Sequence, residues 1–175
     1  MLALDHLAVS ALTLEQGVAQ VEKLLGVTLD GGGQHMHMAT HNRLISLGDI
    51  YLEVIAPDPS LPRPAWPRWF DLDRFQGAPR LTNWIARSDD LAADVAASPA
   101  GAGQITQLSR NAYRWQMAIP GDGILPFDNA FPALIQWQGS AHPVQALPDR
   151  GLRLRQLTVT HPQAQALAAS LAGRF

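Results

Sequence analysis

Two side chains that can transfer protons or bind a metal ion stand in otherwise apolar segments of this sequence. His6 lies in the alternating run Leu2–Ser10, and Glu53 lies in the run Ile50–Ile55. An imidazole titrates near neutral pH and serves as a base or a metal ligand. A carboxylate among apolar neighbours is costly unless it is paired, metal-bound or protonated. We therefore expect His6 and Glu53 to carry chemistry; the alternatives are a histidine held by a neighbouring group and an edge-strand glutamate that faces water.

Three further histidines lie close together, and they raise the question of a zinc site. His35 and His37 share one face if their segment is a strand, and His41 follows soon after. No cysteine accompanies them, and Met36 and Met38 alternate with them. An exposed edge strand with a mobile loop is the favoured interpretation.

The composition excludes several classes of partner. The 175 residues include 13 Lys and Arg and 15 Asp and Glu, which give a net charge of -2. This balance provides no positive surface charge for binding nucleic acid or an anionic membrane. Cysteine is absent, so any metal site must use nitrogen and oxygen ligands. No basic leader precedes the first apolar run, and no apolar stretch has the length of a membrane span. We expect a cytoplasmic protein whose partner is a small organic molecule.

One order of elements occurs three times along the chain, each time as a predicted strand followed by a predicted helix. The copies span Leu2–Leu25, Leu81–Ala97 and Leu152–Leu171. In the first copy Thr13 is expected to cap the start of the helix and Gly26 to end it. Because the third copy has only one strand and one helix, it must pair within the chain or with another chain, as in a homodimer.

Further predicted strands follow the first two strand–helix units. They cover Asn42–Leu47, Ile50–Ile55, Gln104–Leu108, Ala112–Ile119 and Ala133–Trp137. Gly48 and Asp49 separate the first two of these strands and predict a β-hairpin. The run Gly31–Gly33 precedes no phosphate-binding helix signature, so we expect a flexible turn there.

The segment 57–79 contains six prolines and cannot form a helix or a central strand. We therefore expect it to link two structural modules. Trp66, Trp69 and Phe70 lie within it, and because such large apolar surfaces are normally buried, the linker is expected to pack on the body of the protein.

The duplicated βαβββ plan resembles the vicinal-oxygen-chelate superfamily, and within it the glyoxalase-like domain proteins. The matching segments are Asp5–Leu7, Thr40–Gly48, Tyr51–Ala56, Thr82–Leu91, Leu125–Trp137 and Leu157–Pro162. The resemblance implies an α+β fold in which tandem βαβββ modules form a cupped mixed β-sheet with flanking helices, plus a C-terminal partial βα repeat. The corresponding boundaries are 1–56 for the first module, 57–79 for the linker, 80–140 for the second module and 151–175 for the partial third unit.

In the metal-dependent members of this superfamily, each module supplies one ligand from its first strand and one from its last. Matched by motif, these positions are His6, Glu53, Asn83 and Gln136. The resemblance thus implies one divalent metal ion held by His6 and Glu53. The amides of Asn83 and Gln136 bind hard ions weakly and transition metals more weakly than imidazole does. They are expected to hydrogen-bond a ligand, or else to be exposed or structural.

Four more residues in the matching segments are expected to contact the ligand. His41 lies inside the Thr40–Gly48 segment, and the planar guanidinium of Arg43 can orient a carboxylate or a phosphate. Trp84 and Trp137 would give the second module an aromatic lining suited to an apolar or planar substrate. The alternatives are a solvent-facing strand residue for Arg43 and ordinary core packing for the tryptophans.

Three functions fit these observations. The first is a small-molecule enzyme of the lyase, isomerase or dioxygenase class, in which His6 and Glu53 hold a divalent ion or act as base and acid. The second is a metal-free binding protein, like the bleomycin-resistance proteins of the superfamily, with a compound sequestered in an aromatic groove. The third is an interaction scaffold that docks through its C-terminal unit. The first is favoured, because an imidazole and a carboxylate at the matched positions are harder to explain by packing than amides are.

Overall fold

The computed structural model describes residues 1–175, which form eight strands, three α-helices and two short 3-10 helices. In chain order they are β1 (Leu2–Ser10), α1 (Leu14–Leu25), β2 (Asp30–His35), β3 (Thr40–Ser46), β4 (Tyr51–Pro57), η1 (Trp69–Asp71), β5 (Arg80–Ser88), α2 (Leu91–Ala96), β6 (Gln104–Arg110), β7 (Tyr113–Ile119), β8 (Ala133–Trp137), η2 (Pro143–Ala146) and α3 (Ala164–Leu171). None of the helices has the length and apolar character needed to span a membrane.

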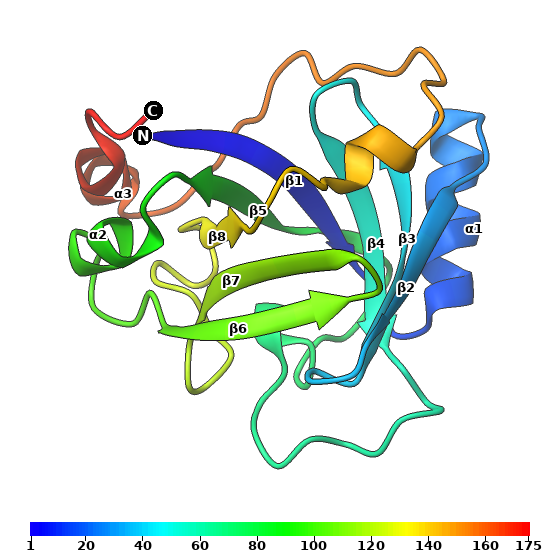
Figure 1. Ribbon diagram of the computed structural model, residues 1–175, viewed down its shortest axis with the longest axis horizontal. Coiled ribbons are helices and arrows are strands. Elements are labelled where there is room, and N and C mark those ends of the chain that lie inside the picture. The colour runs from blue at the N-terminus through cyan, green and yellow to red at the C-terminus, as the bar shows by residue number, and fades with distance from the viewer.

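All eight strands belong to one curled mixed sheet in the order β2-β3-β4-β1-β5-β8-β7-β6. Each module contributes four neighbouring strands, and the modules meet where β1 pairs antiparallel with β5. Within the modules, β1 pairs parallel with β4 and β5 pairs parallel with β8. Helix α1 lies against the β3–β4 half, and α2 and α3 lie together at the other end beside both termini (Figure 1). The predicted α+β class and duplicated βαβββ plan are confirmed.

Helix α1 begins and ends where the sequence predicts. The hydroxyl of Thr13 accepts a hydrogen bond from the Gln16 backbone N–H, and Gly26 ends the helix in the left-handed region at φ 70°. The helix lies very close to β4, because a Cβ on Gly17 would come within 2.4 Å of Val54 Cγ1. This contact fixes the helix on the outer face of the first module and leaves the opposite face of β4 free for the site.

The proline-rich linker packs into the largest apolar cluster. Trp69 and Phe70 are buried there against Ile55 and Ile85 of the central strands. Trp66 instead stays 46% exposed and stacks on His37. The linker therefore packs on the body of the protein through Trp69 and Phe70, as its large side chains predict.

The segment 30–37 differs from the prediction. Gly31–Gly33 is part of β2, not a flexible turn, and the pairing with β3 shifts register between Asp30 and Gly33. A Cβ at Gly32 would lie 2.1 Å from the Asn42 carbonyl oxygen, so glycine is required by this close backbone approach. Strand β2 ends at His35, and His37 lies in the following turn, so these two histidines do not share a strand face.

The third unit contains its predicted helix but lacks its predicted strand. Residues 152–160 pair with no strand, whereas α3 packs within the chain through the buried Leu167. Arg153 and Arg155 alternate along the segment and are exposed, and Arg153 is held by Asp149. Leu152 and Leu154 alternate with these arginines but stay partly exposed, so the segment has the alternating pattern of a strand without a partner strand.

Candidate active site

A β-bulge in β1 places two consecutive side chains together. Leu4 pairs with Ala86 and His6 with Ile85, so Asp5 has no partner on β5. A bulge of this kind redirects a side chain that would otherwise point to the opposite face. Asp5 Oδ1 consequently lies 2.6 Å from His6 Nδ1, and both side chains are buried.

The register of β4 against β1 adds two more side chains. His6 pairs with Tyr51 and Ala8 with Glu53, so Tyr51 and Glu53 lie on the same face as His6. The rings of His6 and Tyr51 stack, with centroids 4.3 Å apart and an interplanar angle of 11°. His6 Nε2 lies 3.5 Å from Glu53 Oε1. The result is a buried carboxylate–imidazole–carboxylate series across two neighbouring strands.

The two carboxylates determine the charge of the imidazole. Burial disfavours the imidazolium, but the hydrogen bonds and charges of Asp5 and Glu53 outweigh burial and raise the pKa of His6 to about 9. Burial also opposes ionisation of both carboxyls, yet hydrogen bonds from histidine lower the pKa of Asp5 and that of Glu53. At neutral pH the series therefore consists of an imidazolium between two carboxylates.

Each carboxylate uses its second oxygen to hold its orientation. Asp5 Oδ2 accepts a hydrogen bond from Trp137 Nε1 at 3.0 Å and lies 3.1 Å from His142 Nε2. Glu53 Oε2 accepts from Asn42 Nδ2 at 2.7 Å. Asp5 is thus fixed by Trp137 of the second module and by His142 just after it, and Glu53 is fixed by the neighbouring strand β3. Glu53 Oε1 and His6 Nε2 differ from the other atoms of the series, because their only polar contact is the 3.5 Å contact with each other.

An arginine from the second module reaches the same site. Arg110 NH1 lies 2.9 Å from Asn42 Oδ1 and 3.1 Å from His35 Nε2, but no carboxylate pairs with its guanidinium. Burial and the positive charge of Arg110 lower the pKa of His35 to about 3, so this imidazole is neutral and accepts from Arg110. The site therefore presents one cation that has no anionic partner.

These groups surround a small cavity of about 30 Å³, which we call the cup cavity. It holds little more than a water molecule, so a larger ligand requires the lining to move. Its polar lining is His6, His35, Asn42, Tyr51, Glu53 and Arg110, and its apolar lining is Trp69, Phe70, Trp115, Met117, Ile135 and Trp137.

Of the eight site residues that the sequence proposes, the cup cavity contains His6, Glu53 and Trp137. His41 lies on the opposite face of β3 from Asn42, 3.8 Å from Asp58, and Arg43 is exposed and donates to the Asn42 carbonyl. Strand alternation separates these two residues from Asn42 and hence from the cup.

The other three proposed residues lie elsewhere. Gln136 faces helix α2, where its side-chain oxygen accepts from Leu91 N at 3.0 Å. Trp84 donates to the Ala130 carbonyl and stacks on Phe175, outside the cup. Asn83 is buried but lines a different cavity.

Sequence reasoning missed more than half of the polar site. Asp5 was detectable as an acid beside His6, and Asn42 and His35 stand in segments that were considered for other roles. Arg110 and His142 reach the site from distant segments, and nothing local in the sequence marks them. The missed residues are Asp5, His35, Asn42, Tyr51, Arg110 and His142.

The two modules are related by a pseudo-twofold axis through the antiparallel pair β1–β5, so each metal-ligand position implied for the first module has a counterpart in the second. His6 pairs with Ile85, and Ala8 pairs with Asn83. Exchange of β1 and β5 therefore maps His6 onto Asn83 and Ala8 onto Ile85. The second module offers a neutral amide where the first offers an imidazole.

The same symmetry corrects the fourth position. Glu53 pairs with Ala8, and Ala133 pairs with Ile85, so the counterpart of Glu53 is Ala133 and not Gln136. A methyl group cannot coordinate a metal, and no group of three or more His, Cys, Asp or Glu side chains is arranged to hold one. The residues present do not fit a divalent ion.

Comparisons with known proteins agree with this architecture. The sequence matches the family described as glyoxalase-like domain over residues 4–175. No curated protein matches. A hypothetical protein from Staphylococcus aureus superposes with a TM-score of 0.54 at 16% identity, over 80% of this chain and 60% of that chain, so this chain spans less than two thirds of its length.

Two epimerase structures are also similar. A methylmalonyl-CoA epimerase variant from Streptomyces coelicolor, in complex with 2-nitronate-propionyl-CoA, has a TM-score of 0.50 at 12% identity, over 79% of this chain and 95% of that chain. The enzyme of the same name from Mycobacterium tuberculosis has a TM-score of 0.49 at 16% identity, over 82% and 91%. At 12% identity the likeness to the Streptomyces coelicolor structure is one of fold alone. With the family match covering nearly the whole sequence, the chain belongs to the glyoxalase-like domain family.

Proposed function

We propose that this protein is an acid–base enzyme of the isomerase type, which moves a proton at a carbon next to a carbonyl group without using a metal ion. The observation that carries the proposal is the arrangement of His6 and Glu53 at the cup cavity. A proton donor, His6 Nε2, and a proton acceptor, Glu53 Oε1, stand 3.5 Å apart and face the same space. This is the geometry required to act on a carbonyl oxygen and its neighbouring C–H group together.

The proposed step is balanced in protons and electrons. The Glu53 carboxylate takes the proton from the carbon next to the carbonyl, and the C–H electron pair moves into the carbonyl to give an enolate. The His6 Nε2–H donates a hydrogen bond to the enolate oxygen, where the negative charge develops. Glu53 then returns the proton to a neighbouring carbon of the conjugated enolate, which isomerises the substrate without oxidation or reduction; return to the same carbon regenerates the substrate and only exchanges the proton with solvent.

The surrounding residues have positioning roles in this proposal. Asp5 keeps Nδ1 of His6 occupied and the imidazole charged, and Tyr51 holds the plane of the ring by stacking. Asn42 fixes the second oxygen of Glu53, so that only Oε1 is directed at the substrate. All of these contacts are buried, and such sites hold their donors in place before the reaction begins.

Arg110 indicates the class of substrate. Its guanidinium lines the cup cavity and has no carboxylate partner. An arginine in this position binds a carboxylate or another anionic group of a ligand in a planar, two-pronged arrangement. We therefore expect a small carbonyl compound with an anionic group, packed against the tryptophans of the cup.

Proton exchange with solvent tests the proposal. The EDTA-treated protein is incubated in D₂O with a panel of 2-oxo acids, 2-methyl-branched acyl thioesters and methylmalonyl-CoA, the compound named with the epimerase structures, and loss of the Cα–H signal is followed by ¹H NMR. We expect exchange of at least one compound by the wild type and none by Glu53→Gln. Exchange by both proteins at the same rate, or no exchange of any compound, would overturn the proposal.

A metal-free binding protein is the second candidate, supported by the five aromatic residues of the cup, Tyr51, Trp69, Phe70, Trp115 and Trp137. The same panel distinguishes the two. A compound that binds the wild type tightly and shows no Cα–H exchange supports sequestration instead of catalysis.

A further inference from the structure

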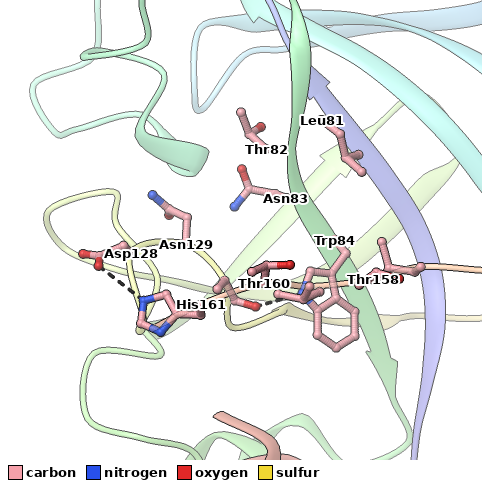
Figure 2. A pocket seen from close by; sticks show the side chains of 12 residues that line it. Leu81, Thr82, Asn83, Trp84, Asp128, Asn129, Thr158, Thr160 and His161 are labelled. Carbon is pink, nitrogen blue, oxygen red and sulfur yellow. Dashed lines mark hydrogen bonds and ion pairs between the residues drawn. The ribbon is translucent and has the colours of Figure 1, made fainter. Parts of the chain in front are cut away.

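A second cavity lies at the unpaired edge of β5, away from the cup. Strand β5 pairs with β8 only along residues 85–87, so its segment Leu81–Trp84 has no strand on that side. A cavity of about 270 Å³ lies between this edge, the turn at 128–130 and the segment 157–161 (Figure 2). We call it the edge cavity. It shares no lining residue with the cup cavity.

Asn83 is the reason to regard the edge cavity as a binding site. The residue is only 2% exposed, and its buried Nδ2 and Oδ1 atoms have no hydrogen-bond partner. Figure 2 shows the carboxamide directed toward Asn129, with no interaction drawn between the two amides. A buried amide that lacks every partner is rare and costly, and it is relieved when a ligand supplies the missing donor and acceptor.

The rest of the lining mixes apolar and polar side chains, and its one carboxylate, that of Asp128, lies beside His161. Asn129 Oδ1 accepts from Leu125 N at 2.9 Å, which leaves its NH₂ group as a donor. His161 Nδ1 accepts from Gln163 N, and its Nε2 lies 3.4 Å from Asp128 Oδ2, so imidazole and carboxylate engage each other. The edge cavity therefore has no cation available for an anionic ligand, and a neutral ligand suits it.

We propose that the edge cavity is a second small-molecule site, which takes a neutral cyclic amide such as a lactam or a cyclic urea. The donor and acceptor of Asn83 lie side by side on one planar group. A ring with an adjacent C=O and N–H satisfies both through two parallel hydrogen bonds. The Asn129 NH₂ and the Thr160 hydroxyl offer further contacts to ring oxygens, and the ring of Trp84 forms an apolar wall.

Uracil tests the proposal, because it presents the required edge, and 1,3-dimethyluracil lacks its N–H donors. Each is titrated into ¹⁵N-labelled protein while the side-chain NH₂ signals of Asn83 are followed by NMR. We expect uracil to shift these signals saturably and 1,3-dimethyluracil to leave them in place. No shift with uracil, or equal shifts with both compounds, would overturn the proposal.

Variants locate the binding. Asn83→Leu removes both hydrogen bonds and is expected to weaken uracil binding at least about tenfold. Thr160→Val is a milder change at an exposed position and should weaken binding measurably, so the proposal stays testable if the leucine variant does not fold. Thr106→Val on β6, outside the cavity, is the matched control and should bind as the wild type does. Wild-type affinity in both Asn83→Leu and Thr160→Val would overturn the proposal.

Discussion

Glu53 and Ala133 occupy equivalent places in the two modules, but only Glu53 has a side chain that can coordinate a metal ion. Glu53 pairs with Ala8 on β1, and Ala133 pairs with Ile85 on β5. The chain thus keeps the duplicated fold of its family but has a carboxylate in only one of the two places. The chemistry of the cup is accordingly carried by an unsymmetrical set of residues, most of them in the first module.

Added metal should therefore leave the protein unchanged. A ligand that binds only the folded state raises its stability, by about 2.7 kcal/mol at a concentration one hundred times its Kd. We expect Zn²⁺, Ni²⁺ and Mn²⁺ to leave the melting temperature of the purified protein where it is, and mass spectrometry to find no stoichiometric metal. A metal-dependent rise that disappears in both His6→Ala and Glu53→Ala would show that the site binds metal after all.

Glu53→Gln should abolish proton exchange while keeping ligand binding. The amide has the shape of the carboxylate but cannot accept a proton from carbon, and loss of a general base typically costs about 10² to 10⁴ in rate. The matched control is Glu15→Gln, in the first turn of α1 and away from the cup. Kinetics should show a lower kcat for Glu53→Gln only. A KM effect alone would assign Glu53 to binding.

Arg110→Gln should weaken the binding of anionic substrates. Hydrogen bonds to a charged group contribute about 1.5–3 kcal/mol, so we expect KM to rise about tenfold or more for a carboxylate-bearing compound and little for its neutral ester. Arg114→Gln, on the neighbouring strand β7, removes an arginine that donates only to backbone carbonyls and provides the control. An equal loss for acid and ester would argue that Arg110 only supports the fold.

Stability should be greatest near neutral pH, because two buried histidines titrate in opposite directions. The pKa of His6 is raised in the folded chain, from 6.5 to about 9, so its stabilising effect is complete below pH 6.5 and is lost as pH rises through 9. That loss amounts to about 3 kcal/mol. The pKa of His35 is lowered to about 3 in the folded chain. Between pH 6.5 and pH 3 this histidine is therefore protonated only in the unfolded chain. The free energy of unfolding falls over that range as the pH is lowered.

Urea unfolding from pH 4 to pH 10 measures this profile. His6→Gln should flatten the alkaline side and His35→Gln the acid side. If both variants keep the wild-type profile, the titrations that shape it belong to other groups.

Two buried asparagines provide a matched test of hydrogen-bond satisfaction. Asn42 and Asn83 are each 2% exposed, but Asn42 contacts Glu53, Arg110 and the Gly33 backbone, whereas Asn83 has no partner. We expect Asn42→Leu to destabilise the protein and Asn83→Leu to stabilise it, each by about 1–3 kcal/mol. Thermal unfolding measures both. A loss of stability in Asn83→Leu would mean that its amide is bonded in solution.

The elements of this fold follow from local patterns in the sequence, and its site follows only in part. Alternation and capping residues predict β1, α1 and the β3–β4 hairpin, because these depend on neighbours in the chain. The sequence places an edge strand near His35 but not the glycine-containing part of β2, because three glycines resemble a turn and their close approach to the backbone depends on β3. The strand expected at 152–160 was wrong because alternation alone does not supply a partner.

The same limit explains the site. His6 and Glu53 stand out because polar groups are rare in apolar strands. Gln136 was matched to Glu53 by motif, but the register of β8 turns it toward α2 and puts Ala133 in the equivalent place. Arg110 reaches the site from β6 of the second module and His142 from the segment that follows this module, and a single sequence does not reveal either long-range contact.

An NMR titration of the His6 imidazole tests the central claim most directly, since the proposed chemistry requires a charged imidazole between Asp5 and Glu53. The ¹⁵N shifts of both ring nitrogens are followed from pH 5 to pH 10.5 in EDTA, with His6→Gln to assign them. We predict an imidazolium at pH 7, with both nitrogens protonated and a midpoint near pH 9. A neutral ring at pH 7, with Nε2 unprotonated and free to bind metal, would contradict the claim.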